Sequence, residues 1–582
     1  HRSSVFSGAM ALLFAACGGT GEISAPLDNE FAPGNSSDGA GTPGGATTPG
    51  GTPGLPPDNP PGGNTPPGTN VPPVQVGDPT YLDDPRALGL TELRALTSTE
   101  MLWSLEDAFQ LDLNDLGTFL PEDVIEEEYS PFDNRAELQS ISFGLVNGIE
   151  AFAYAVADRV VSSGLPQVHA IAGCSPTGNV TADSGCFVQH VEQLGRLLWR
   201  RAPDPATVDS FSELYAIAVD DSDFGAALRY LVAGMIQSPS FFFRAEFGTN
   251  DPVDPDLLEL DNYSVASRLS FLFWGTGPDH ALLAAAESGE LLDPISRAQH
   301  AARLFNDPRA ERHWQRYHAL WLGYETVPLP TDLENDMRGE TQALVRRIVF
   351  EENLPWSAFF EMDESFVTPG LAEHYDMPVP SQPDWVPYDH RRGGGVLSHA
   401  TFLAQGAKFN DTSPTVRGYR VAKRMLCQVF DTIPPSIDTD NPPGAGTGGC
   451  KEERYTMRDS AACQSCHIVT DGIGFGLENF DAYGAYRDVE TADPSCAVRG
   501  EGSFDGQDYA GAAELGALFA GSDDVGYCAT TQLYRFLTGK IEGPSDRKAL
   551  DALFAQYRDT PTLRGLLFDL IDRPSFTHRV RD

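Results

Sequence analysis

Five consecutive residues constrain the fold of this chain more than any other feature: Cys463-Gln464-Ser465-Cys466-His467. The pattern C-x-x-C-H is the attachment signature of a c-type haem. The two thiols bond to the vinyl groups of the haem, and the adjacent imidazole ligates the iron from one side. We therefore predict one covalent haem c, held by Cys463 and Cys466, with His467 as the proximal iron ligand.

Two other chemistries use the same residue types. A zinc site needs a fourth ligand, and it gives no reason for a histidine directly after the second cysteine. A thioredoxin-like dithiol belongs in a βαβ context, which the sequence around Cys463 does not indicate. Both alternatives are weaker than haem attachment.

The sixth coordination position of the iron decides what the haem can do. Met457, six residues before Cys463, is the first candidate, because methionine is a standard axial ligand and raises the reduction potential. His399 is the second candidate. Five further side chains are weaker candidates: His313, His318, His374, Met377 and Met425. The alternatives are that Met457 fills core space and that the sixth position is open.

The segment after the motif is rich in glycine and aromatic residues. Three glycines would let the backbone approach a flat ligand: Gly472, Gly474 and Gly476. Three large apolar residues either pack on the porphyrin or belong to an ordinary core: Phe475, Leu477 and Phe480. Arg487 is a candidate partner for a haem propionate, with a surface ion pair as the alternative.

The cysteine count agrees with an exported protein. The chain has nine cysteines, of which Cys17 is assigned to lipid and two are assigned to haem. Six remain for disulfides: Cys174, Cys186, Cys427, Cys450, Cys496 and Cys528. Pairing of sequence neighbours, one of many possible arrangements, predicts Cys174–Cys186, Cys427–Cys450 and Cys496–Cys528. Disulfides and covalent haem belong to oxidising compartments outside the cytoplasm.

The first 80 residues read as an export signal and a tether. An apolar run from Val5 to Ala16 precedes Cys17, and Phe14-Ala15-Ala16-Cys17 is similar to a bacterial lipobox, with an ordinary signal as the alternative. Cleavage before Cys17 would leave it as a lipidated N-terminus. Residues 18–80 are mostly Gly, Pro and Thr, which bury too little apolar surface to offset their ordering entropy. We expect a membrane-anchored lipoprotein on a disordered tether.

Composition describes the rest of the chain. With 83 acidic and 40 basic residues, the net charge of −43 argues against nucleic acid as a partner. Apolar residues recur at helical spacing from about Thr91 onward, so we predict a mainly α fold with long irregular loops. The length of 582 residues suggests several folded units, three or four by the usual domain size.

One sequence pattern occurs twice. Residues 236–241 (IQSPSF) precede Arg244, and residues 571–576 (IDRPSF) precede Arg579. Both copies follow an apolar helix, so we interpret them as a repeated helix ending. Proline stops the helix, phenylalanine packs back onto it, and arginine caps the freed carbonyl groups.

The chain resembles a family of multi-module proteins of planctomycetes and myxobacteria. The resemblance lies in Cys463 to His467, in Asp471, in the segment GFGLENFDA at 474–482 and in GAYR at 484–487. Further matching stretches are Thr91–Leu111, Cys186–Pro203, 266–270 with 273–275, 395–398 with 412–414 and 417–418, and Tyr534–Arg579. The family is known by domains of unknown function (DUF1587, DUF1595, DUF1592, DUF1588 and DUF1585). The resemblance implies five consecutive modules, at 88–150, 174–246, 262–390, 393–490 and 500–582, of which 393–490 is a haem c domain, and supplies no reaction.

Together these features predict an extracytoplasmic c-type haem lipoprotein that works in electron transfer with an unknown redox partner protein. The first alternative is a haem-dependent oxidoreductase that acts on an extracellular polymer or its degradation products, because the helical modules exceed what a carrier needs. The second alternative is a binding module whose haem is structural.

Overall fold

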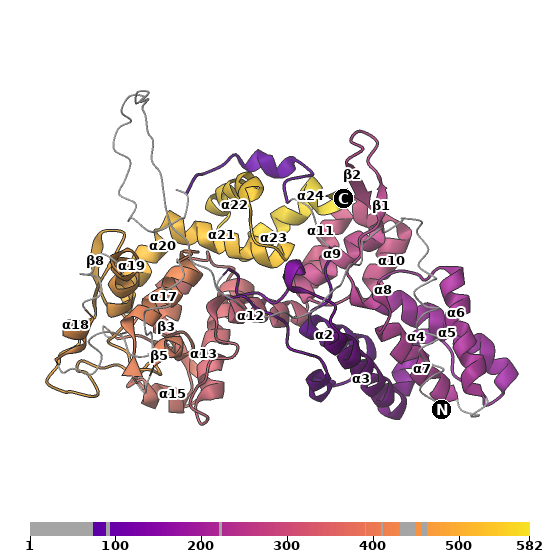
Figure 1. The fold of residues 1–582 in the computed structure, drawn as a ribbon, viewed down its shortest axis with the longest axis horizontal. Coiled ribbons are helices and arrows are strands. Elements are labelled where there is room, and N and C mark those ends of the chain that lie inside the picture. The colour runs from indigo at the N-terminus through magenta and orange to yellow at the C-terminus, as the bar shows by residue number, and fades with distance from the viewer. Residues whose placement is uncertain are drawn as a thin grey trace, which may run out of the picture. The chain divides into compact units, whose positions relative to one another are not determined.

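The computed structural model describes residues 74–88, 93–127, 129–219, 224–389, 392–408, 411–430, 449–455 and 463–581, all of them within one compact unit (Figure 1). Cys17, residues 18–73 of the predicted tether and Met457 lie outside the described residues. The described part is mainly helical, with a few short strands and long connections, which confirms the predicted fold class. Within it, no helix has the length and apolar character needed to cross a membrane.

The N-terminal part is built from helices around one hydrophobic core, to which Phe152, Phe187 and Leu231 belong. Its helix α2 begins with a capping box, in which the side chains of Thr97 and Glu100 accept each other's backbone N–H groups. The elements are η1 (Pro79–Asp83), α2 (Ser98–Phe109), η2 (Asn114–Phe119), η3 (Ala136–Leu138), α3 (Phe143–Arg159), η4 (Val160–Gly164), α4 (Leu165–Ala172), α5 (Val180–Leu198), α6 (Pro205–Val219), α7 (Phe224–Ile236) and α8 (Pro239–Phe242).

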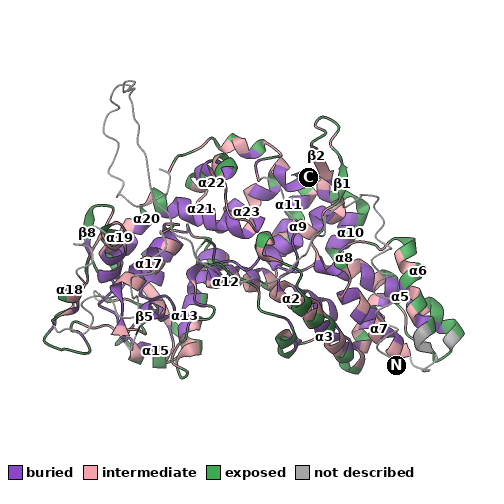
Figure 2. Ribbon diagram, viewed as in Figure 1, coloured by how far each residue is buried: buried purple, intermediate pink, exposed green. Residues whose placement is uncertain are grey.

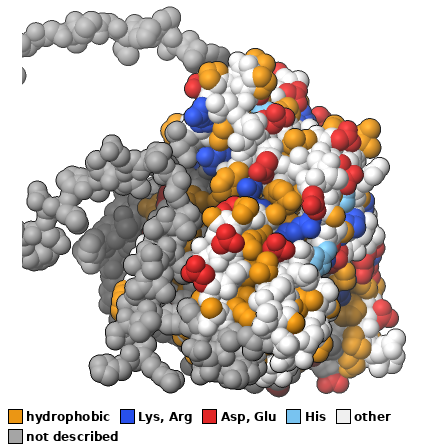
Figure 3. All heavy atoms as spheres, turned by 90° about the vertical axis from the view of Figure 1, so that its right-hand side faces the viewer, with side chains coloured by type: hydrophobic (Ala, Val, Ile, Leu, Met, Phe, Trp, Pro, Cys, Tyr) orange, Lys and Arg blue, Asp and Glu red, His pale blue; other side chains and the backbone are white. Residues whose placement is uncertain are grey.

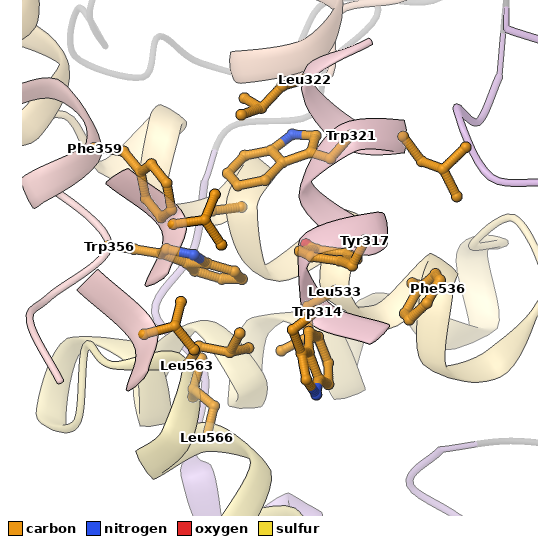
Figure 4. Close-up of a cluster of buried hydrophobic side chains, with 14 of the residues drawn as sticks. Trp314, Tyr317, Trp321, Leu322, Trp356, Phe359, Leu533, Phe536, Leu563 and Leu566 are labelled. Atoms are coloured by element: carbon orange, nitrogen blue, oxygen red, sulfur yellow. The ribbon is translucent and has the colours of Figure 1, made fainter. Parts of the chain in front are cut away.

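The middle of the chain contains helix α12, which carries Trp314, Tyr317 and Trp321 along one face. These rings lie among Trp356 and the side chains of later helices (Figure 4). The elements are β1 (Gly248–Asn250), β2 (Leu257–Leu260), α9 (Asn262–Trp274), α10 (His280–Ser288), η5 (Glu290–Leu292), α11 (Pro294–Phe305), α12 (Pro308–Leu322), α13 (Glu334–Arg346), η6 (Arg347–Glu351), α14 (Ala358–Glu361), β3 (Glu364–Val367), α15 (Pro369–His374) and β4 (Asp384–Pro387).

The last third carries the haem motif and the C-terminal helices. The elements are η7 (Gly395–Ser398), α16 (Ala400–Leu403), η8 (Ala404–Gly406), β5 (Ala407–Lys408), β6 (Asp411–Thr412), α17 (Pro414–Met425), α18 (Lys451–Arg454), α19 (Gln464–Phe475), β7 (Glu501–Phe504), β8 (Gln507–Ala510), α20 (Gly511–Ala520), α21 (Asp523–Thr538), η10 (Pro544–Asp546), α22 (Arg547–Asp559), α23 (Leu563–Asp572), α24 (Pro574–Thr577) and β9 (His578–Val580). Helix α21 is buried along nearly its whole length (Figure 2).

A second hydrophobic core crosses the module boundaries that the sequence suggested. It joins residues of α9 and α12 to residues of α17, α19, α21 and α23. The C-terminal strand β9 also returns to the middle of the chain, where it pairs antiparallel with β2 in the three-stranded sheet β1-β2-β9. The sequence modules at 262–390, 393–490 and 500–582 therefore share one core instead of folding around separate cores.

On the face drawn in Figure 3, acidic and basic side chains are interspersed among apolar ones. Ion pairs such as Arg229–Asp158 and Arg196–Glu287 place opposite charges side by side on the described residues.

The repeated helix ending is present at both predicted places. Helices α7 and α23 each end shortly before a proline that opens a one-turn helix, α8 or α24. The phenylalanines of the two copies, Phe241 and Phe576, are both buried.

The arginines that cap the two endings differ from the predicted ones. The guanidinium of Arg200 donates to the carbonyl groups of residues 240, 241 and 243. Arg268 donates to the carbonyl groups at the three equivalent positions of the second copy, 575, 576 and 578. The prediction had assigned this role to Arg244 and Arg579, whereas Arg244 forms an ion pair with Glu100. The two capping arginines come from other segments: Arg200 follows the end of α5, and Arg268 lies within α9.

The six remaining cysteines form three disulfides: Cys174–Cys186, Cys427–Cys528 and Cys450–Cys496. The first pair confirms the prediction. The other two predicted pairs, Cys427–Cys450 and Cys496–Cys528, are wrong.

Tertiary packing explains the two wrong pairs. Helix α17 packs against α21, so Cys427, just past the end of α17, lies beside Cys528 within α21. The backbone N–H of Lys451 donates to the side chain of Glu490, and Glu490 in turn donates its own N–H to the carbonyl group of Cys496. These bonds hold Cys450 next to Cys496, 46 residues away in the sequence.

Candidate functional site

Helix α19 carries the haem motif on its first turn. Cys463 is the N-cap residue, and its carbonyl group accepts the backbone N–H groups of Cys466 and His467. The helix therefore holds both sulfurs and the imidazole within one turn. Cys463 and Cys466 are free thiols, whereas the other six cysteines of the described residues are in disulfides.

The imidazole of His467 is held by a buried carboxylate. Nδ1 of His467 lies 2.9 Å from Oδ2 of Asp471, one helical turn further along α19. The side chain of Asp471 is fully buried, while 23% of the His467 side chain is exposed. An ionised carboxylate only accepts hydrogen bonds, so Nδ1 carries the proton and Nε2 is left with a lone pair for a metal.

The other carboxylate oxygen of Asp471 is fixed from helix α17. The Thr415 hydroxyl group donates to Oδ1 across 2.6 Å, and the Thr470 hydroxyl group donates to the same atom across 3.4 Å. Because a hydrogen-bonded carboxylate orients the ring of a metal-binding histidine, Asp471 and Thr415 form the support behind His467.

The glycines after the motif lie where the chain packs closely on itself: Gly474 faces helix α17, and Gly472 and Gly476 face strands β7 and β8. A Cβ at Gly474 would lie 1.7 Å from the carbonyl oxygen of Pro414, and one at Gly476 would lie 2.2 Å from the ring of Tyr509. From the other helix, a Cβ at Gly418 would lie 1.6 Å from the carbonyl oxygen of Thr470. Helices α17 and α19 therefore cross in backbone contact, which brings Thr415 to Asp471.

A buried ion cluster lies after the motif and includes Arg487. Its centre is the carboxylate of Glu478, which is within 3.2 Å of the cationic groups of Arg417, Lys451 and Arg487. Burial lowers the pKa of the Arg417 guanidinium. Arg487 also donates to the Thr412 hydroxyl group. These contacts use its hydrogen-bonding groups within the chain, and a propionate contact of Arg487 stays a prediction.

The three apolar residues proposed to contact a porphyrin are core residues in this structure. All three side chains are buried: Phe475, Leu477 and Phe480. The rings of Phe475 and Tyr455 meet edge to face. This packing corresponds to the core alternative for these residues.

Among the described residues, the candidates for the sixth iron ligand have their recorded contacts away from His467. Met457, the first candidate, lies outside the described residues. His399 is fully buried, with Nδ1 at 3.0 Å from the Thr341 hydroxyl group and Nε2 at 3.6 Å from Glu340, and burial lowers its pKa to about 3.

The weaker candidates each have contacts of their own. Nδ1 of His318 donates to the carbonyl group of Trp314, and Nε2 of His374 donates to that of Tyr483. The remaining three are buried: His313, Met377 and Met425.

Zinc and dithiol chemistry find little support in the described residues. Two groups there have metal-ligand composition, Cys174 with Cys186 and His190, and Cys450 with Glu490 and Cys496. In both groups the two sulfurs are already joined in a disulfide. All strand pairs among the named strands are antiparallel, so the βαβ context of a thioredoxin-like dithiol is not found there.

The residues present fit a c-type haem. Two free thiols three residues apart would carry the macrocycle, and the adjacent imidazole presents Nε2 while its Nδ1 is anchored. Sequence reasoning missed the role of Asp471 and Thr415. The spacing of four residues between His467 and Asp471 on a helix was the available signal for the first. No sequence signal pointed to Thr415, which reaches the site through helix packing.

A cavity of about 450 Å³ lies apart from the haem motif, among residues of α2, α5, the turn before α10, and α12. The Ser104 hydroxyl group on its wall is buried and has no hydrogen-bond partner among the described residues. Burial raises the pKa of Glu106, whose carboxylate also lines the cavity. His280 and Gln167 add further polar groups, so the cavity can hold a polar molecule.

Four family models match the chain. They are described as protein of unknown function DUF1595 at residues 186–246, DUF1592 at 260–377, DUF1588 at 392–490 and DUF1585 at 505–576. The DUF1588 match contains the haem motif and both helices that support it. Neither curated proteins nor solved structures gave a match.

Proposed function

We propose that this chain, which belongs to the multi-module family of unknown function and carries four of its modules in order, is an extracytoplasmic c-type haem lipoprotein that works in electron transfer. The observation that carries the proposal is the first turn of α19, where two free thiols precede a histidine whose Nδ1 is anchored by Asp471. When bound there, a haem would supply one-electron redox chemistry. Cys463 and Cys466 would hold the haem, Asp471 would orient the imidazole of His467, and helix α17 would lie behind Asp471.

Covalent attachment is the first test. The protein is produced in a host with cytochrome c assembly machinery and extracted with acidified acetone. Haem should remain with the polypeptide in the wild type and in a Cys174→Ser/Cys186→Ser control. It should be absent from the polypeptide after Cys463→Ser/Cys466→Ser. Loss of all haem from the wild type on extraction would overturn the proposal.

The sixth ligand separates the carrier from the enzyme. We propose Met457 as this ligand, which predicts a low-spin spectrum with a weak far-red band in the ferric state and no reaction with carbon monoxide or peroxide. A Met457→Ala variant should lose the band. An unchanged band in this variant would remove the assignment of Met457.

The second candidate function is a haem-dependent oxidoreductase acting on an extracellular polymer or its products. The cavity of about 450 Å³ beside Ser104 and Glu106 supports it, because a cavity with polar groups on its wall can hold a small polar substrate. A high-spin, five-coordinate haem that binds carbon monoxide would support this function. The third reading, a structural haem, predicts that reduction and oxidation leave partner binding unchanged.

The membrane anchor is a separate part of the proposal. Lipid on Cys17 would hold the protein at the membrane through the tether at 18–80. A Cys17→Ser variant should move from the membrane fraction to the soluble fraction, and an unchanged distribution would contradict lipidation. The redox partner is proposed to be a protein, and nucleic acid is not expected to bind.

A further inference from the structure

Two buried carboxylates in the haem module are compensated in very different ways. Glu478 is surrounded by three cationic side chains. Asp471 is at least as buried, yet no Lys or Arg of the described residues forms an ion pair with it, and its contacts are the Nδ1–H group of His467 and the hydroxyl groups of Thr415 and Thr470. A buried carboxylate without a cation is costly, so the site needs positive charge on the His467 side of Asp471.

We propose that Asp471 is a positioning residue that stabilises the oxidised iron and thereby lowers the reduction potential of the haem. This inference rests on the proposed function. An iron bound at Nε2 of His467 would polarise the imidazole ring. The Nδ1–H group of the ring, which donates a hydrogen bond to Asp471, would then carry more positive charge. A ferric centre carries one positive charge more than a ferrous centre, so the buried carboxylate favours the ferric state.

The geometry shows that this carboxylate is held in place. Its Oδ2 atom faces His467 and its Oδ1 atom is bound by Thr415, a residue of the neighbouring helix α17. The backbone contact at Gly474 and Gly418 keeps that helix in position. Rotation of the Asp471 side chain toward solvent would break its hydrogen bonds to both His467 and Thr415.

The first measurement is a spectroelectrochemical titration of the haem-loaded protein and its Asp471→Asn variant. Asparagine keeps the size of the side chain and removes its charge. We expect the equilibrium constant for reduction to rise about tenfold, which raises the midpoint potential by about 59 mV for one electron. Asp488→Asn, which removes one charge from an exposed position of the same module, is the matched control and should shift the potential much less.

A second variant separates charge from packing. Thr415→Val keeps the carboxylate and the side-chain shape but removes the competing hydrogen bond to Oδ1. The carboxylate then interacts more strongly with His467, so the midpoint potential should fall, opposite to the effect of Asp471→Asn. If Asp471→Asn does not mature, the sign of the Thr415→Val shift decides the question.

The outcomes distinguish the inference from the proposed function. If the wild type carries no covalent haem, both are wrong. If it carries haem and Asp471→Asn shifts the potential no more than Asp488→Asn, the inference alone is wrong. Shifts of the same sign in the Asp471→Asn and Thr415→Val variants would show a loosened site and would also overturn it.

Discussion

Replacing Gly474 by alanine tests whether the crossing of α17 and α19 supports the site. The new Cβ would lie 1.7 Å from the carbonyl oxygen of Pro414, and real Cβ atoms essentially never come within 3.0 Å of another heavy atom. The obstacle is backbone, which cannot rotate away as a side chain can. The two helices must therefore separate by roughly 1 Å or more, with the strain of an overpacked core.

The expected magnitude follows from two opposing effects. Overpacking costs about 1–3 kcal/mol or more, and alanine in place of glycine returns at most about 1 kcal/mol of helix propensity. We expect a net loss of about 2 kcal/mol in the free energy of unfolding. Because Pro414 precedes Thr415, the hydrogen bond from Thr415 to Asp471 should also lengthen.

The assay is urea unfolding followed by circular dichroism and, in the haem-loaded protein, by haem absorbance. Gly339→Ala is the matched control, because Gly339 lies within α13 and a Cβ there has no heavy atom within 4 Å. That variant should be up to about 1 kcal/mol more stable than the wild type. The argument fails if the Gly474→Ala variant is as stable as the Gly339→Ala variant.

Three further predictions concern other parts of the fold. Burial raises the pKa of Glu340 to about 7. Between about pH 4.5 and 7 the native state therefore keeps a proton that the unfolded state releases, and the free energy of unfolding should fall by roughly 3 kcal/mol over that range. Urea unfolding of a Glu340→Gln variant at several pH values should show a smaller decline than the wild type, whereas equal slopes would refute this. Removing the Cys427–Cys528 disulfide, which spans 101 residues, should cost about 4–5 kcal/mol in urea unfolding, and a loss under about 1 kcal/mol would contradict the loop-entropy estimate. Arg268→Ala should cost about 3–5 kcal/mol, because it removes the ion pair with the largely buried Glu246 and uncaps three carbonyl groups. Thermal unfolding at the level of the wild type would disprove that role.

Local signals in the sequence predicted the helical class and the neighbourhood of the site. Apolar residues at helical spacing mark α2 and α12, since that period depends only on the geometry of a single helix. The haem motif could be identified for the same reason, because Cys463, Cys466 and His467 act together within one turn. The nearest disulfide, Cys174–Cys186, was also within reach of local reasoning.

Features that join distant segments could not be predicted in this way. The partners of Cys427 and Cys450, the capping role of Arg200 and Arg268, and the contact of Thr415 with Asp471 all depend on how helices pack. Glycines gave an ambiguous signal, because a residue without Cβ serves close packing of the chain as well as contact with a ligand.

The sequence by itself therefore determined the helical class and the position of the candidate site, because the motif and the helix periods are properties of neighbouring residues. Only the tertiary structure decided what surrounds that site: a buried carboxylate behind His467, a second helix behind the carboxylate, and one core across several sequence modules. The physical reason is that burial and long-range contacts arise from the packing of segments far apart in the chain, and no local pattern encodes their partners.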